Sequence, residues 1–315
     1  MGRERARRRR GVQHLAALLT TDAVLAPVQG TTLPTWTPRP WSLRPASYRL
    51  AAAPFLFLAA LFVLPLLRVV VQGFQHAPAA PDNFTRIATS GPYMAVLLGT
   101  VQTACVVTVV CLLLAYPLAY AGARLQGRWH TLFMGAILVP LFTSVVVRSY
   151  AWMVLFQRNG PFNQALVWLD WPGAPVRLLQ TPFAVDVGMV HILLPFMVLP
   201  ILGAMRAIDP SMLQAGELLG APPWRVFTRI FVPLTLPGAS AGVILVFISA
   251  LGFFITPALL GGARSTTIAV LIEQQAVDLL NWPMASALAT VLLVLSVMVY
   301  LGYNHLTRRF NDVRT

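Results

Sequence analysis

The sequence contains no lysine: all 23 basic side chains among its 315 residues are arginines. A P-loop needs a lysine to reach the β- and γ-phosphates of a nucleotide, and a Schiff-base enzyme needs a lysine amine. The absence of lysine therefore excludes both kinds of site. In particular, it excludes ATP binding through a Walker A motif of this chain.

Charged residues of either sign are also few. The chain is 10% charged and 57% hydrophobic, whereas a soluble globular domain carries about 25% charged and about 45–50% apolar residues. This composition excludes an ordinary soluble enzyme. The formal net charge of +13 does not indicate a nucleic-acid surface, because six arginines lie in the first ten residues and most others interrupt apolar runs. We expect membrane lipid and no nucleic acid as a partner.

Cysteine is nearly absent, and the side-chain sets that carry chemistry are missing. Cys105 and Cys111 lie six residues apart in an apolar stretch with no His, Asp or Glu beside them. This spacing fits neither a zinc site nor a disulfide framework, so both are predicted to be small buried hydrophobic residues. No Ser/His/Asp set, paired buried carboxylates or His-Glu motif is present. We therefore expect no catalytic residues, no metal and no enzyme activity.

What the sequence has in abundance is long apolar runs. A helix needs about 20 apolar residues to cross the hydrocarbon core of a bilayer, and open sheet edges cannot survive there. The runs therefore predict an all-α fold, a polytopic bundle of six transmembrane helices. The six runs are Leu50–Leu67, Tyr93–Ala123, Trp129–Val147, Val187–Met205, Ile230–Ala263 and Leu279–Thr307.

The arginines predict the orientation of these spans. With the N-terminus in the cytoplasm, 17 of the 23 arginines fall on the cytoplasmic side, as the positive-inside rule requires, so both termini are expected inside. Residues 1–49 are predicted to be a disordered Arg- and Pro-rich cytoplasmic tail. An Arg-rich start before Leu15–Leu19 also resembles a signal peptide, but that apolar run is only five residues long.

One cytoplasmic connection, between the fourth and fifth spans, has the signals of a short helix. Asp209 suits an N-cap, Pro210 the first helical position, and Gly220 a C-terminal stop. Its apolar residues could dock on the bundle; they are Met212, Leu213 and Leu219. A second short helix is expected from Pro222, broken by Pro233. The pair could transmit force, or it could be an interfacial helix that only anchors the loop.

This loop resembles that of inner-membrane permeases of ABC-type importers. There the motif is Glu-Ala-Ala, three residues, Gly, nine residues, then Ile-x-Leu-Pro. Here it is Gln214-Ala215-Gly216, then Gly220, then Ile230-Phe231-Val232-Pro233, with the spacing kept. The resemblance implies a cytoplasmic coupling helix that seats in a groove of a separate ATPase subunit. Gln214 replaces the family Glu and Gly216 the second Ala, while Glu217 lies on nearly the same helical face.

Further motifs are similar to those of the spermidine/putrescine permease subgroup, and the similarity covers roughly residues 50–310. They are Arg148–Trp152, Gln157–Gly160, Leu194–Pro200, Gly252–Gly262, Trp282-Pro283 and Ala285–Leu288. The resemblance implies a non-catalytic permease domain in a bacterial inner membrane that forms half of a translocation path and works by alternating access. It also implies the partners: a second permease, two ATP-binding subunits that hold the ATP, and an extracytoplasmic solute-binding protein. No cofactor is expected in this chain.

A polyamine cargo would need carboxylates and ring faces along its path. The candidate path residues are Arg148, Tyr150, Trp152, Asp186, Phe254, Glu273 and Asp278. Each could instead be an interfacial charge or part of an aromatic belt. Arginines on the same side of the membrane would repel a polycation, so another cargo, such as a phosphonate, iron or sulfate, is an alternative. A self-sufficient secondary transporter or an intramembrane enzyme is a further alternative, although such transporters often carry carboxylates at mid-depth, of which this chain has few.

Overall fold

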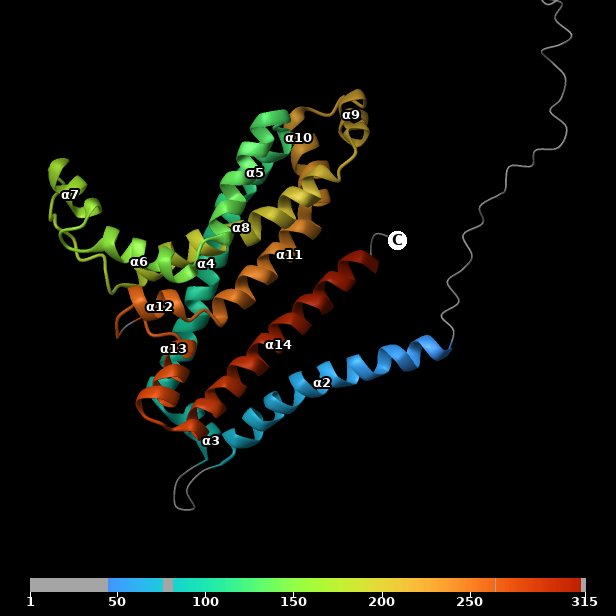
Figure 1. Cartoon of the computed structure of the whole chain (residues 1–315). Helices are drawn as coiled ribbons and strands as arrows, with labels where there is room; N and C mark the ends of the chain where they lie inside the picture. The colour runs from blue at the N-terminus through green and yellow to red at the C-terminus, as the bar shows by residue number, and fades with distance from the viewer. Residues whose placement is uncertain (1–44, 76–81, 264, 313–315) are drawn as a thin grey trace, which may run out of the picture. The chain divides into compact units, whose positions relative to one another are not determined.

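The computed structural model describes residues 45–75, 82–263 and 265–312, and within those ranges every regular element is helical (Figure 1). The predicted all-α fold is therefore confirmed. By its internal contacts the chain divides within helix α2, between Ala59 and Ala60, and the packing described below is that of the residues from Ala60 on. Most of the predicted tail lies outside the described residues.

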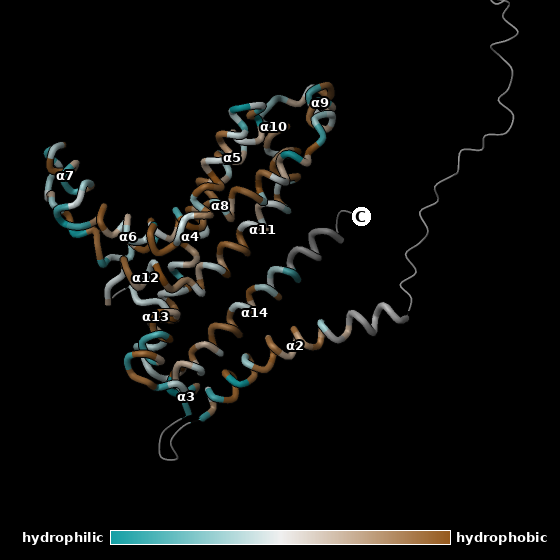
Figure 2. The backbone as a smooth tube through the Cα atoms, in the orientation of Figure 1, coloured by the Kyte–Doolittle hydropathy of each residue, from teal (hydrophilic) through white to brown (hydrophobic). Residues whose placement is uncertain are grey.

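Among the described residues, five helices are long and apolar enough to cross a membrane, and Figure 2 shows apolar residues along them. A sixth crossing is present if α5 (Gly127–Phe142) counts together with the helices that follow it, α6 (Val145–Phe156) and α7 (Pro161–Trp168). The five are α2 (Pro45–Gly73), α4 (Gly91–Arg124), α8 (Pro182–Arg206), α11 (Val232–Leu251) with the turns before it, and α14 (Trp282–Asp312). The predicted runs thus locate the helices correctly.

Several predicted boundaries are wrong. Helix α2 runs from Pro45 to Gly73, whereas the first span was predicted over Leu50–Leu67. The third span ends at Phe142 and not at Val147, because Thr143 and Ser144 have extended backbones and the chain bends there by 96°. Helix α11 ends at Leu251, long before Ala263. Charge-free sequence cannot reveal these ends, because a bend between two apolar helices leaves the hydropathy unchanged.

After α11 the chain forms several short helices before α14. They are α12 (Ile255–Leu260), α13 (Ile268–Glu273) and the π-helical turn η3 (Gln274–Asp278). A short helix α3 (Asn83–Thr89) likewise precedes α4. The Asn83 amide fixes the turn before it by donating to the carbonyl oxygens of Gly73 and Gln75, at 3.0 and 2.9 Å.

The core lies where α4, α8 and α11 pack together, and it is built on small side chains. On α4 the fully buried positions recur every three or four residues, and most of them are small: Ala104, Val107, Cys111, Ala115 and Ala119. Lipid tails are as apolar as leucine, so helices in a bilayer associate through close packing and hydrogen bonds. Small residues permit the close approach that such packing needs. Cys111 is one of these buried residues, as predicted, whereas Cys105 is exposed.

Helices α8 and α11 pack closely at Gly238-x-x-x-Gly242, a motif that was not predicted from the sequence. A Cβ on Gly238 would lie 2.4 Å from Ala204 Cβ and 2.5 Å from the Pro200 carbonyl oxygen. A Cβ on Gly242 would lie 2.8 Å from the sulfur of Met197. Only glycine lets these backbones pack so closely, as in the small-xxx-small interfaces of membrane helices.

Candidate functional site

The predicted loop helix is present as α9 (Pro210–Leu218), and its caps are those that the sequence indicates. The Asp209 carboxylate accepts a hydrogen bond of 2.9 Å from the Ser211 backbone N–H. That bond lowers the pKa of Asp209. Gly220 has φ +79°, the left-handed conformation of a helix stop, and the Ala221 N–H reaches back to the Gly216 carbonyl at 3.2 Å. Local sequence therefore determines where this helix begins and ends.

Helix α9 is fixed to the next element through its one buried residue, Gly216. A Cβ there would lie 2.7 Å from Ile230 Cδ1 and 3.4 Å from Val226 Cγ2. Ile230 and Gly216 are the two motif positions that pack together. The family spacing between them thus corresponds to a contact between α9 and the following turn.

The helix that follows α9 was expected to end at Pro233, but it does not. The chain continues from α10 (Pro223–Val226) through the π-helical turn η2 (Phe227–Phe231) into α11. Proline lacks an N–H and its ring crowds the carbonyl four residues earlier, which here belongs to Arg229. A π-helical turn shifts the hydrogen-bond register and so accommodates the proline without a break.

Aromatic rings connect η2 to the C-terminal end of α4. Phe227 and Phe231 stack with ring centroids 5.5 Å apart, and the Tyr120 ring meets both edge-on at 5.7 and 5.5 Å. Arg124 donates to the Tyr120 hydroxyl and lies over its ring. Nearby, Arg206 at the end of α8 donates to the Gly122 carbonyl at 3.2 Å. A displacement of η2 would therefore be passed to α4.

The outer side of α9 is exposed and partly apolar. Gln214, Ala215 and Glu217 are exposed, and Leu218 and Leu219 are each 89% exposed. The expectation that Leu219 docks on the bundle is therefore wrong. Behind the helix, a cavity of about 470 Å³ separates α9 from the ends of α4 and α8, and Glu217, Arg124 and Arg206 all line it. Whether Glu217 replaces the missing family carboxylate stays a prediction.

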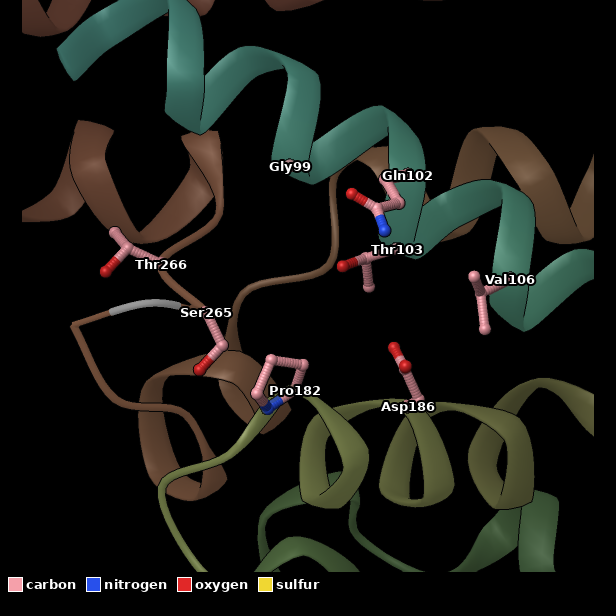
Figure 3. Close-up of a pocket in the computed structure, with 8 residues that line it drawn as sticks. All are labelled: Gly99, Gln102, Thr103, Val106, Pro182, Asp186, Ser265 and Thr266. Atoms are coloured by element: carbon pink, nitrogen blue, oxygen red, sulfur yellow. The ribbon is translucent and has the colours of Figure 1, made fainter.

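The seven candidate path residues do not share one cavity. Asp186, which the sequence places just before span four, lies one turn inside α8, and of the seven it alone lines a cavity of about 110 Å³ between α4, α8 and the loop after α12. Figure 3 shows its carboxylate directed toward Thr103 and Gln102 on α4, with Ser265 on the far side.

Arg148 and Trp152 lie on α6, beyond the bend, and not at the end of span three. Arg148 is only 8% exposed, and its Nη2 donates to the Thr143 carbonyl oxygen at 3.3 Å. Trp152 Nε1 donates to Nδ1 of His191 on α8 at 3.1 Å. Ser149 also bonds Thr256 of α12 at 2.9 Å between their hydroxyl oxygens. These contacts hold α6 against α8 and α12.

The remaining candidates are dispersed. Tyr150 and Phe254 are 51% and 37% exposed on α6 and just before α12, whereas Glu273 ends α13 and Asp278 ends η3. In the part of the chain that the structure describes, no three His, Cys, Asp or Glu residues gather as metal ligands would. A separate cavity of about 540 Å³ carries two cations, Arg158 and Arg177.

Bent apolar helices, a partly exposed amphipathic loop helix and cavities between the helices are features of a membrane transport subunit. Over residues 39–312 the chain matches the family described as "Binding-protein-dependent transport system inner membrane component", and it belongs to that family. It is therefore a multi-pass inner-membrane permease subunit of a binding-protein-dependent importer, and ATP hydrolysis resides in a separate subunit. A second permease, an ATPase and a binding protein are its partners.

The relatives agree with this membership. The spermidine/putrescine transport system permease protein PotB of Escherichia coli is 35% identical over 230 residues, which are 73% of this chain and 83% of that protein. PotB of Haemophilus influenzae is 32% identical over 81% of this chain and 91% of its own length. A chain of a bacterial alginate ABC transporter has the same fold, with a TM-score of 0.67 at 18% identity, over 84% of this chain and 94% of that one.

Proposed function

We propose that α9 is the coupling helix through which a separate ATPase drives this permease. The observation that carries the proposal is the combination of an exposed end, Leu218 and Leu219, with a buried attachment, Gly216 against Ile230 and Val226. Exposed leucines on a helix that is attached to η2 through Gly216 provide a surface for another subunit to push or pull. An interfacial anchor would place the same leucines in lipid, and the retention or loss of the ATPase in the test below separates the two roles.

The route of this force runs from α9 into η2 and then into α4. Contact between Gly216 and Ile230 links the first pair, and the Tyr120 ring against Phe227 and Phe231 links the second. Closure of two ATP-binding subunits would move α9 and switch the path between its inward- and outward-facing states, in an alternating-access cycle with a second permease of different sequence. The matching test is co-purification: wild-type protein should retain an ATPase, whereas Leu218→Ser/Leu219→Ser should insert normally but lose it.

We propose a polyamine as the cargo. The names of the PotB relatives support spermidine or putrescine, and the Asp186 carboxylate beside a polar cavity supports a cationic group. One observation favours an anion instead, because Arg158 and Arg177 line a separate and larger cavity. Binding-protein-dependent uptake of labelled putrescine, spermidine, a phosphonate and sulfate decides between them. Uptake of an anion without polyamine uptake contradicts the proposed cargo.

We also propose that both termini are cytoplasmic and that residues 50–310 form the permease domain. Single cysteines introduced in a Cys105→Ala background test the topology. Ala215→Cys should be labelled only from the cytoplasm, and Trp168→Cys, at an 87% exposed position on α7, only from outside. Asn163 is unsuitable as a labelling site because it is buried and bonded to the Val176 backbone. Labelling of both positions from one side contradicts the six-span topology.

A further inference from the structure

Asp186 has a carboxylate oxygen without a hydrogen-bond partner inside the helix bundle. Its Oδ1 atom is buried and accepts no hydrogen bond, although α8 around it is apolar and tightly packed. A buried ionised carboxylate without a partner is strongly unfavourable, and charged residues within membrane helices usually face a partner or a water-filled path. The position of this oxygen therefore points to a group that is bound for part of the transport cycle.

The cavity beside Asp186 has the chemistry of a site for a small hydrogen-bond donor. Gln102 and Thr103 extend from α4, and Ser265 and Thr266 belong to the loop after α12, so that amide and hydroxyl groups line the cavity together with the carboxylate (Figure 3). Ser265 is held in place because its hydroxyl accepts from the Gly262 N–H at 2.8 Å. Among the residues that the structure describes, Asp186 is the one charged side chain that lines the cavity.

We propose that this cavity binds one primary ammonium group of the cargo, with Asp186 as its counter-ion; this inference rests on the proposed polyamine function. An ammonium group has three donors and one positive charge, which match one carboxylate and several neutral oxygens. A volume of about 110 Å³ holds several waters or an ammonium group with a short alkyl stem. Divalent metals usually require more carboxylates than one, and an anion would be repelled.

The test uses a thiol placed in the cavity of the intact importer. Thr103→Cys is introduced in a Cys105→Ala background and treated with two reagents of similar size, aminoethyl methanethiosulfonate, a cation, and sulfonatoethyl methanethiosulfonate, an anion. Relative to the ratio of their rates with a free thiol in solution, the cationic reagent should be preferred by about tenfold or more, as one charged hydrogen bond predicts. Asp186→Asn should abolish this preference. Asp170→Asn is the matched control, because that carboxylate is exposed and its φ of +53° is one that asparagine tolerates.

Loss of the preference in Asp186→Asn alone supports the ammonium site. A ratio of rates in the Thr103→Cys protein equal to that with the free thiol, or a preference that survives Asp186→Asn, overturns it. Putrescine uptake gives the second readout: Asp186→Asn should lower it by about tenfold or more while the ATPase still co-purifies, and unchanged uptake overturns the role in transport. Failure of the proposed polyamine function gives a different result from failure of the ammonium site. If the cargo is not a polyamine, the importer with wild-type Asp186 takes up no polyamine at all, whatever the ratio of labelling rates.

Discussion

Gly216 and Ile230 are in such close contact that a Cβ on the first would lie 2.7 Å from the Cδ1 of the second. The two residues belong to different helices, α9 and the turn η2, and they are 14 positions apart in the sequence. The atom in the way is the flexible end of a side chain, not backbone. The site therefore tolerates one methyl group with a small rotation of Ile230, but not a large side chain.

Substitutions at Gly216 should reveal this contact. Gly216→Ala should leave ATPase co-purification and uptake near wild type, because better helix propensity offsets the shift of Ile230. Gly216→Leu should displace α9 and lose both, since overpacking costs about 1–3 kcal/mol. Gly216→Leu/Ile230→Ala should recover part of the loss by creating space. If the double variant is as defective as Gly216→Leu, the contact does not couple the two helices.

The effect of a substitution at Gly220 should depend only on whether the new residue can adopt the backbone conformation found there. Its φ is +79°, and nothing lies within 4 Å of the position that a Cβ would take. Gly220→Val should weaken ATPase co-purification and uptake, because a branched residue in the left-handed region costs about 1–2 kcal/mol. Gly220→Asn is the matched control and should retain both, since asparagine adopts this conformation readily. Normal uptake with Gly220→Val would remove the helix stop from the mechanism.

The crossing of α8 and α11 should be the most sensitive point of the fold. Gly238→Leu would force a side chain against Ala204 and the Pro200 carbonyl, so we expect a loss of about 1–3 kcal/mol or more. The thermal unfolding midpoint of the detergent-solubilised protein should fall clearly. Gly203→Leu, at an exposed glycine of α8 with open space around it, is the control and should leave the midpoint nearly unchanged. Equal midpoints for the two variants would contradict the packing described above.

Asp209 should stabilise α9 as a charged cap without making it pH-sensitive near neutrality. The Ser211 N–H lowers its pKa in the folded protein. The stabilisation is therefore fully present above the ordinary value of about 3.9 and is lost only as the pH falls through the lowered pKa. ATPase co-purification should be flat with pH near neutrality, weaker in Asp209→Ala, and retained in Asp209→Asn, whose side-chain oxygen can still accept the bond. A loss with Asp209→Asn equal to that with Asp209→Ala would show that the cap is not what matters.

The sequence by itself determined the features that depend on neighbouring residues. Apolar length located the membrane helices, and Asp209, Pro210 and Gly220 fixed the ends of α9, because caps and stops act through backbone groups a few residues away. The loop motif indicated the family. That motif fixes the spacing between Gly216 and Ile230, but the spacing alone does not show that the two residues are in contact.

Only the tertiary structure decided the rest, because it depends on groups that lie far apart in the sequence. The bend after Phe142 and the continuous helix through Pro233 leave no mark in hydropathy. The Asp186 cavity combines side chains from α4, α8 and the loop after α12, more than 160 residues apart at the extremes. A path residue is defined by what faces it across the bundle, so sequence could nominate Asp186 but could not separate it from the six candidates that lie elsewhere.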